Sequence, residues 1–190
     1  MSSPKVWFSK CHPLWSIFWI SLIHALVIVT GASTGFGRSM TELVLKQGGI
    51  AIATLRTPST LEDLRARWPE DKLVILKLDV TKREDIDAGL EYVKAEVGRI
   101  DFVFNNAGYG LMGEVEGTPE DAARAMFEVN FWGATYVARQ SVKFFRDVNQ
   151  PQGGTLLNVS SYMGLIPQLL MGYYVASKHG KHSSKCWGPP

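Results

Sequence analysis

The sequence predicts an α/β domain built on a doubly wound, mainly parallel sheet, and three observations lead to it. Short apolar runs of strand length alternate with longer stretches of helical periodicity. The runs are nearly continuous in apolar residues, which indicates strands that are covered on both faces. A glycine-rich turn follows the first run, and open α/β sheets bind their ligands at the carboxyl ends of strands.

The alternation sets the expected order of the elements. Strands are expected at residues 25–29, 50–55, 73–78, 102–104 and 154–159. Helices are expected at residues 36–47, 61–68, 83–97 and 119–145, and a last helix begins at residue 173. Ser59 and Thr60 are suitable N-cap residues for the second helix, and Thr118 followed by Pro119 begins the fourth. Strands separated by helices in this way form βαβ units.

Composition indicates one ordinary globular domain and argues against a nucleic-acid-binding protein and a cysteine-ligated metal site. Of the 190 residues, 46% are hydrophobic and 20% are charged, and the formal net charge is +2. This balance gives no reason to expect a nucleic-acid partner. The two cysteines, Cys11 and Cys186, stand near opposite ends of the chain without metal-ligand spacing. We expect them to be reduced thiols in a cytoplasmic protein, and we expect no metal site.

The turn after the first strand has the chemistry of a phosphate site. Residues 30–37 read Thr-Gly-Ala-Ser-Thr-Gly-Phe-Gly. Glycines let the backbone approach a pyrophosphate, and the helix that follows offers free N–H groups at its N-terminus. Taken alone, the turn also fits a tight strand-to-helix loop without a ligand.

Further motifs follow in order along the chain. Asp79 comes directly after the third strand, and Asn130 lies in the long fourth helix. The remaining motifs are Asn105-Asn106-Ala107-Gly108 after the fourth strand, Asn158-Val159-Ser160-Ser161 at the end of the fifth, and Tyr174-Val175-Ala176-Ser177-Lys178 in the last helix. Together with the TGxxxGxG spacing of the turn, the set covers roughly residues 25–179 and resembles the short-chain dehydrogenase/reductase family.

The resemblance implies a Rossmann-type fold and hydride transfer between a nicotinamide cofactor and a small carbonyl or alcohol substrate. It implies catalytic roles for four residues: Asn130, Ser161, Tyr174 and Lys178. It implies cofactor contacts for a larger set: Gly31, Ser33, Gly35, Phe36, Gly37, Asp79, Asn106, Ala107, Gly108, Tyr174 and Lys178. In the family, the acid after the third strand lies against the adenine ring. The motif lysine binds the nicotinamide ribose, and the helix asparagine holds a water for proton relay.

The Tyr174–Lys178 pair has a physical rationale of its own. A spacing of four residues puts both side chains on one helix face, one turn apart. A nearby ammonium favours phenolate and lowers the pKa of a tyrosine from about 10 towards working pH, as acid–base catalysis requires. Ser161 precedes Tyr174 by thirteen residues, the separation usual in the family, and would stabilise charge on the substrate oxygen. Its neighbour Ser160 competes for that role.

The end of the second strand favours NADP(H) over NAD(H). Enzymes that prefer NAD usually carry an acid there for the ribose hydroxyls, whereas this chain has Arg56. Arg56 would pair with a 2′-phosphate, and Arg38 near the glycine turn would assist. The alternative is that Arg56 is an ordinary exposed loop residue. NADPH as cofactor implies carbonyl reduction as the physiological direction.

Two segments depart from the family pattern, so we expect an atypical segment at residues 1–24, the dinucleotide-binding domain at 25–179 and a polar tail at 180–190. Residues 9–26 look inserted, because residues 1–8 would themselves lead into the glycine turn. Their apolar part also fits a membrane anchor at residues 14–29, although it runs into the first strand without a cleavage site. Residues 180–190 are not expected to extend a helix.

The tail has functional consequences. The family continues with further strands, so we expect a sheet that is incomplete at its C-terminal edge and open to aggregation. The family's homo-oligomer is then not expected. Tyr174 and Lys178 would lie on a frayed last turn, with weak turnover or none. An alternative to the reductase is therefore a non-catalytic chain that binds cofactor weakly or associates with a full-length relative, and a third reading is an unstable product without function.

Overall fold

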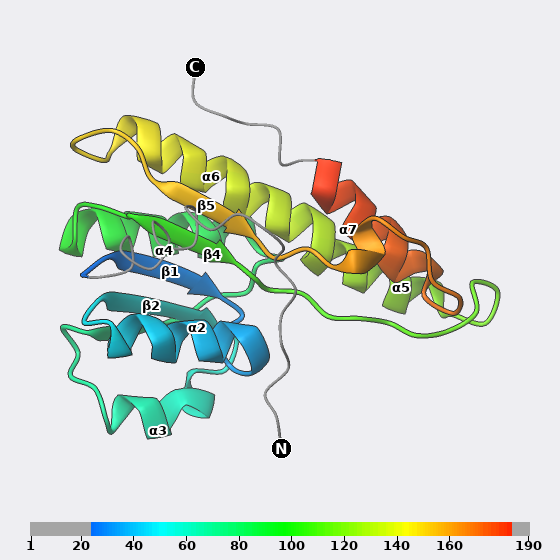
Figure 1. Ribbon diagram of the computed structural model, residues 1–190, viewed down its shortest axis with the longest axis horizontal. Helices are drawn as coiled ribbons and strands as arrows, with labels where there is room; N and C mark the ends of the chain where they lie inside the picture. The colour runs from blue at the N-terminus through cyan, green and yellow to red at the C-terminus, as the bar shows by residue number, and fades with distance from the viewer. Residues whose placement is uncertain (1–23, 184–190) are drawn as a thin grey trace, which may run out of the picture.

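The computed structural model describes residues 24–183, which form one sheet with helices on both faces (Figure 1). Five parallel strands lie in the order β3-β2-β1-β4-β5. Their bounds are β1 Leu26–Thr30, β2 Ile50–Leu55, β3 Leu73–Lys77, β4 Phe102–Asn105 and β5 Thr155–Asn158. In the register, Val29 of β1 lies between Ala53 of β2 and Phe104 of β4. The predicted doubly wound α/β fold is thereby confirmed.

The two faces of the sheet are covered by different helices. On one face α2 (Gly35–Lys46), a 3₁₀ turn at Pro58–Leu61 and α3 (Glu62–Arg65) enclose one apolar cluster, which includes Val27, Val29, Val44, Leu45, Leu61 and Leu64. On the other, α4 (Arg83–Glu96) and α6 (Ala134–Asp147) enclose a second, which includes Ile28, Ile52, Ile86, Val93, Val137 and Phe144. Neighbouring side chains of β1 alternate between these clusters, as the pleat of a strand requires.

The remaining elements lie past the carboxyl ends of the strands. They are α5 (Glu120–Phe127), a π-helical segment η2 (Glu128–Gly133), a 3₁₀ turn η3 (Tyr162–Gly164) and α7 (Gly172–Ser183). Helix α7 packs against η2, η3 and α5. The strand order reverses between β1 and β4, and open α/β sheets bind ligands at such a switch point.

Three local expectations about helices are corrected. The helix predicted at 119–145 contains the π-helical segment, and Thr118 does not cap it, because its hydroxyl donates to the carbonyl of Glu114. The helix predicted at 61–68 is a 3₁₀ turn followed by one α-helical turn. Helix α7 does not end at Gly180 but continues to Ser183, so Lys178 is not on a frayed last turn.

The N-terminal segment is described only from residue 24 onward. Ala25 and Leu26, which the sequence grouped with an inserted segment, are buried in the core, and Leu26 begins β1. Cys11, Cys186 and most of the apolar run at 14–29 lie outside the described residues. Among residues 24–183, no helix is long and apolar enough to cross a bilayer.

Candidate active site

The glycine-rich turn makes a cradle that a side chain would fill. Gly31 has a left-handed backbone, with φ of +65°, and a Cβ there would lie 3.0 Å from the Cα of Ala107. A Cβ on Gly37 would collide with the carbonyl oxygen of Gly31 and lie 2.7 Å from Nδ2 of Asn106. Since no side chain fits at either position, the turn brings α2 directly against the loop after β4.

Thr30 joins the glycine turn to that loop. Its hydroxyl oxygen accepts hydrogen bonds from the backbone N–H groups of Asn106, at 2.9 Å, and Ala107, at 3.0 Å. The Asn106 side chain in turn donates to the carbonyls of Thr30, at 3.0 Å, and Gly31, at 3.3 Å. Thr30 and Asn106 thus fasten to each other the two segments that the sequence assigns to the cofactor.

The start of α2 leaves backbone donors for an anion. Thr34 stands at the N-cap in an extended conformation, and its side chain makes no capping hydrogen bond. The first N–H groups of the helix, from Gly35 onward, therefore have the geometry of a phosphate site. Phe36 is 73% exposed, so its side chain points away from the core. Ser33 lies in the same turn and is partly buried.

Asp79 follows β3 and shapes its own loop. Its Oδ1 accepts hydrogen bonds from the N–H of Thr81, at 3.0 Å, and the hydroxyl of Thr81, at 2.8 Å. The N–H of Asp79 donates to Asp85, at 2.9 Å. These bonds fix the carboxylate at the carboxyl end of β3, two strands away from β1.

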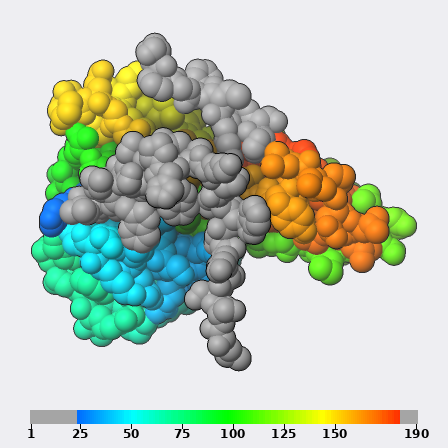
Figure 2. Space-filling model, in the orientation of Figure 1, coloured from blue at the N-terminus to red at the C-terminus, as the bar shows by residue number. Residues whose placement is uncertain are grey.

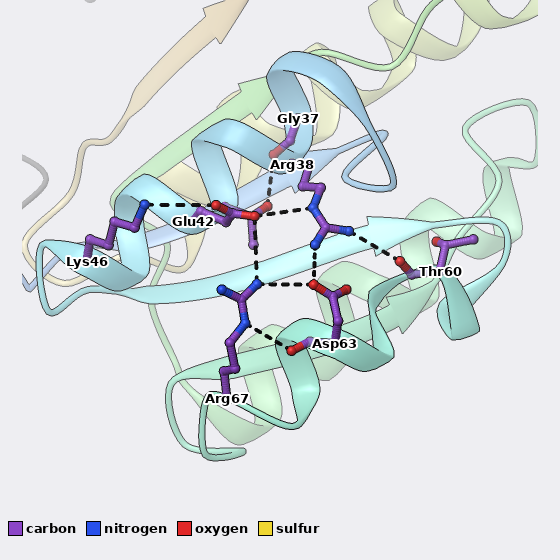
Figure 3. Close-up of polar contacts among 8 residues, drawn as sticks. Gly37, Arg38, Glu42, Lys46, Thr60, Asp63 and Arg67 are labelled. Atoms are coloured by element: carbon purple, nitrogen blue, oxygen red, sulfur yellow. Dashed lines mark hydrogen bonds and ion pairs between the residues drawn. The ribbon is translucent and has the colours of Figure 1, made fainter.

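The two arginines named for the cofactor phosphate differ in their surroundings. Arg38 lies between Glu42 and Asp63, and its guanidinium also donates to the carbonyl of Thr60 (Figure 3). The hydrogen bond with Arg38 holds the pKa of Asp63 below its usual value, and Asp63 raises the pKa of Arg38. Arg67 joins the same cluster through Asp63, at 3.1 Å.

Arg56, by contrast, is exposed directly after β2 and makes no ion pair with any residue between 24 and 183. A guanidinium held by two carboxylates is poorly placed to take a phosphate, whereas one without an acidic partner keeps its hydrogen-bond donors. The geometry therefore separates a structural arginine, Arg38, from an available one, Arg56.

Asn130 occupies the π-helical segment and is 0% exposed. Its Nδ2 donates to the carbonyl of Tyr109, at 2.8 Å, and to the hydroxyl of Ser177, at 3.2 Å. Its Oδ1 accepts from the N–H of Tyr109, at 3.0 Å. The side chain thus ties the loop after β4 to α7, which a surface asparagine would not do.

Tyr174 and Lys178 share the face of α7 that meets this loop. The Nζ of Lys178 lies 5.5 Å from the centroid of the Tyr174 ring, within the range of a cation–π contact. Lys178 is 4% exposed, and burial lowers the pKa of its amine. A Cβ added at Gly108 would lie 3.5 Å from that Nζ, and one added at Gly110 would lie 3.9 Å from the Tyr174 ring.

The two serines after β5 are in different environments. Ser161 caps η3, where its Oγ accepts from the N–H of Met163 at 3.2 Å, and its own O–H donates to no acceptor among residues 24–183. The Oγ of Ser160 is buried and makes no hydrogen bond within the described part of the chain. Turn η3 packs against α7 so closely that a Cβ on Gly164 would lie 3.0 Å from the Lys178 carbonyl. This packing brings the segment of Ser161 to the helix of Tyr174.

Sequence reasoning missed two contributors to this arrangement. Asn105 ends β4, and its Nδ2 donates to Asn158 of β5, at 2.7 Å, and to the carbonyl of Ala134, at 2.8 Å. Lys181, assigned to the tail, is buried on α7. Asn105 could have been identified from the sequence, because it is a polar residue at the end of a strand and the first residue of the Asn105–Gly108 motif. No pattern marked Lys181.

Two loops project together on the side of the molecule that lies past the carboxyl ends of the strands (Figure 2). One follows Gly110 and the other follows η3, and the N–H of Gly113 donates to the carbonyl of Leu170 at 2.8 Å. They expose apolar side chains, among them Met112, Val115, Leu165, Ile166, Leu169 and Leu170. The loops flank the end of α7 that carries Tyr174.

The chain is similar to known proteins over most of its described length. Residues 25–184 match the family model described as short chain dehydrogenase. An uncharacterized oxidoreductase of Schizosaccharomyces pombe is 36% identical over 152 residues, which are 80% of this chain and 50% of that protein. The chain therefore spans about half the length of the curated relatives that it matches.

Solved structures show the same fold. A short-chain dehydrogenase from Streptomyces avermitilis is 35% identical, with a TM-score of 0.78 over 84% of this chain and 57% of that one. A short chain dehydrogenase/reductase from Burkholderia phymatum, solved in complex with NAD, is 25% identical, with a TM-score of 0.78 over 86% of this chain and 58% of that one.

Proposed function

Because the chain belongs to the short-chain dehydrogenase family, we propose that it is a nicotinamide-dependent oxidoreductase that reduces a small ketone or aldehyde. The observation that supports the proposal is that Thr30 fastens the glycine turn to the loop after β4. In that loop, a Cβ on Gly108 would lie 3.5 Å from the Nζ of Lys178. The glycine turn suits a dinucleotide, because the lack of a side chain at Gly31 and Gly37 lets the backbone come close to a phosphate.

A bound nicotinamide would supply the hydride, and the residues of this chain would supply the proton and hold the substrate. Tyr174 donates the proton to the developing alkoxide, and Ser161 donates a hydrogen bond to the same oxygen. Lys178 would bind the nicotinamide ribose and would stabilise the phenolate that remains on Tyr174. Asn130 holds the loop and α7 at their present separation, and a water beside it completes the proton relay.

NADPH is the proposed cofactor, with Arg56 as the ligand of its 2′-phosphate. This role is supported by the guanidinium of Arg56, which makes no ion pair with any residue between 24 and 183, whereas Arg38 is paired with Glu42 and Asp63. Asp79 would lie against the adenine. The Burkholderia phymatum relative was solved with NAD, so the preference of this chain depends on Arg56 and must be tested directly.

The first measurement is the thermal melt of the 190-residue chain with and without each cofactor. At a concentration of about 100 times Kd, NADPH should raise Tm by roughly 5 to 10 °C, and NADH should raise it less. Arg56→Asp should weaken NADPH binding about tenfold or more while sparing NADH. Arg139→Asp, an exposed charge reversal on α6, is the matched control. An unchanged preference in Arg56→Asp would show that Arg56 does not bind the phosphate.

Turnover is tested through Tyr174. NADPH oxidation with a panel of small carbonyl compounds should be lost in Tyr174→Phe, while the cofactor-induced rise in Tm persists. Cofactor binding without any turnover in the unsubstituted chain would instead favour the non-catalytic alternative. A melt that responds to neither cofactor would contradict the proposal as a whole.

A further inference from the structure

Lys181 is unusual because it is a lysine with 1% of its surface exposed. Taking an ammonium group out of water costs free energy unless polar atoms surround it, so fully buried lysines are rare. Lys181 lies one turn beyond Lys178 on α7, and none of the roles proposed above uses it. A buried lysine this close to Tyr174 and Lys178 is a candidate for a role in the proposed active site.

The Lys181 ammonium contacts the end of strand β4. Its Nζ donates to the carbonyl oxygen of Asn105 at 3.2 Å. Asn105 is the last residue of β4, and the cofactor loop at residues 106–108 follows it directly. The Asn105 side chain also contacts Asn158 of β5 and the carbonyl of Ala134. Lys181 therefore joins α7 to the residue at which two strands and α6 meet.

One face of α7 carries Lys181 together with the residues of the proposed active site. Tyr174, Ser177, Lys178 and Lys181 follow helical spacing and lie on the same side of the helix. Ser177 fastens the middle of α7 to Asn130, and Lys181 fastens its end to Asn105. A Cβ on Gly180 would lie 3.0 Å from the Phe131 ring, so the backbone beside Lys181 is also closely packed.

We propose that Lys181 is a positioning residue, whose ammonium fixes the separation between α7 and the cofactor loop at the end of β4. Through this link it holds Tyr174 and Lys178 in place relative to residues 106–108. The anchor is a property of the cofactor-free chain, and its effect on cofactor binding rests on the proposed function.

Replacement by methionine separates positioning from stability. Methionine keeps the length and apolar stem of lysine but removes the charge. The Asn105 carbonyl keeps the hydrogen bond from the N–H of Val159, at 3.0 Å, so it is not left unsatisfied. Because methionine is apolar and of similar volume, the packing around position 181 should be retained. The link between α7 and β4 should nevertheless be lost.

The test measures amide hydrogen exchange in the 190-residue chain without cofactor. In Lys181→Met, the N–H groups of Asn106 and Ala107 should exchange about tenfold faster than in the unsubstituted chain. Exchange in β2 and α2 should not change. Lys77→Met, which removes an exposed lysine from β3, is the matched control and should leave the loop protected. Lys181→Arg keeps a cation and should restore most of the protection.

Three results would overturn the proposal. The first is unchanged exchange at the loop in Lys181→Met. The second is faster exchange throughout the sheet together with a lower Tm, which would indicate general destabilisation. The third is equal loss of protection in Lys181→Arg and Lys181→Met, which would assign the effect to packing and not to the ammonium.

NADPH fluorescence titration then measures the consequence for the cofactor. Lys181→Met should bind NADPH about tenfold more weakly than the unsubstituted chain, and Lys77→Met should bind it equally well. Equal affinity in all three chains would show that the anchor does not serve the cofactor. If the unsubstituted chain binds no NADPH, the proposed function fails, and the exchange experiment still decides whether Lys181 anchors the loop.

Discussion

Lys178 holds its amine almost entirely out of water, and that burial couples the stability of the fold to pH. Desolvation lowers the pKa of Lys178 below its ordinary value of 10.5. Between the lowered folded value and the unfolded value, the unfolded chain binds more protons than the folded one. Stability therefore rises as pH increases through that window, and the penalty for burying the charged form is fully present below it.

Removing the amine should remove this coupling. At neutral pH, Lys178→Met should gain stability relative to the unsubstituted chain, because it carries no buried charge, and the gain should shrink as pH rises towards 10.5. Urea unfolding at several pH values measures the difference. Lys77→Met, which removes an exposed lysine from β3, is the matched control for the loss of a lysine. A difference in Lys178→Met that does not vary with pH would contradict the desolvation of Lys178.

Single residues were predictable where a motif fixes their spacing, and unpredictable where tertiary contact alone places them. Tyr174 and Lys178 lie one turn apart, as their four-residue separation requires. The buried position of Lys181 could not be predicted, because composition marks a lysine as exposed and only the packing of α7 turns it inward. The engagement of Arg38 depends on Asp63, which lies 25 residues away in the sequence.

At the scale of the elements, the π-helical segment sets where Asn130 lies. A π-turn is wider than an α-turn and rotates the helix that follows it. At the end of the segment, Gly133 passes directly over the loop after β3: a Cβ there would lie 2.5 Å from the carbonyl oxygen of Val80. Neither backbone can move without shifting an element of the core.

Gly133→Ala should therefore destabilise the chain by about 1–3 kcal/mol, because the added methyl group forces α6 away from the loop that follows β3. The free energy of unfolding in urea measures the loss. Gly117→Ala is the matched control, since its Cβ would meet nothing closer than 3.9 Å, and it should change stability by less than about 1 kcal/mol. Equal unfolding midpoints for the two variants would show that Gly133 is not tightly packed.

The strands were predicted within a residue or two, because buried parallel strands read as short apolar runs bounded by turns. The interruption at residues 128–133 was not predictable, since apolar spacing continues through α5, η2 and α6 without a break. The length of α7 was underestimated for a related reason. Gly180 weakens a helix in isolation, but here its missing side chain makes room for Phe131.

At the scale of the whole molecule, β5 lies at one edge of the sheet and, among the described residues, pairs only with β4. Its side chains alternate, and Leu157 is 40% exposed. An apolar strand edge offers unpaired backbone groups and a surface that a second chain can cover. We therefore expect the chain to self-associate through β5 as its concentration rises.

Leu157→Lys tests this expectation, because a lysine on the exposed face of an edge strand opposes pairing with another strand while leaving the core intact. Static light scattering at rising protein concentration should show less association than for the unsubstituted chain, with Tm unchanged within a few degrees. Tyr92→Lys adds the same charge and removes a comparably exposed apolar residue from α4, away from the edge, and should leave association unchanged. If both variants reduce association equally, net charge is responsible. If neither does, the edge of β5 is protected and association must arise elsewhere, with the projecting loops at Met112 and Leu169 as the next apolar surface to substitute.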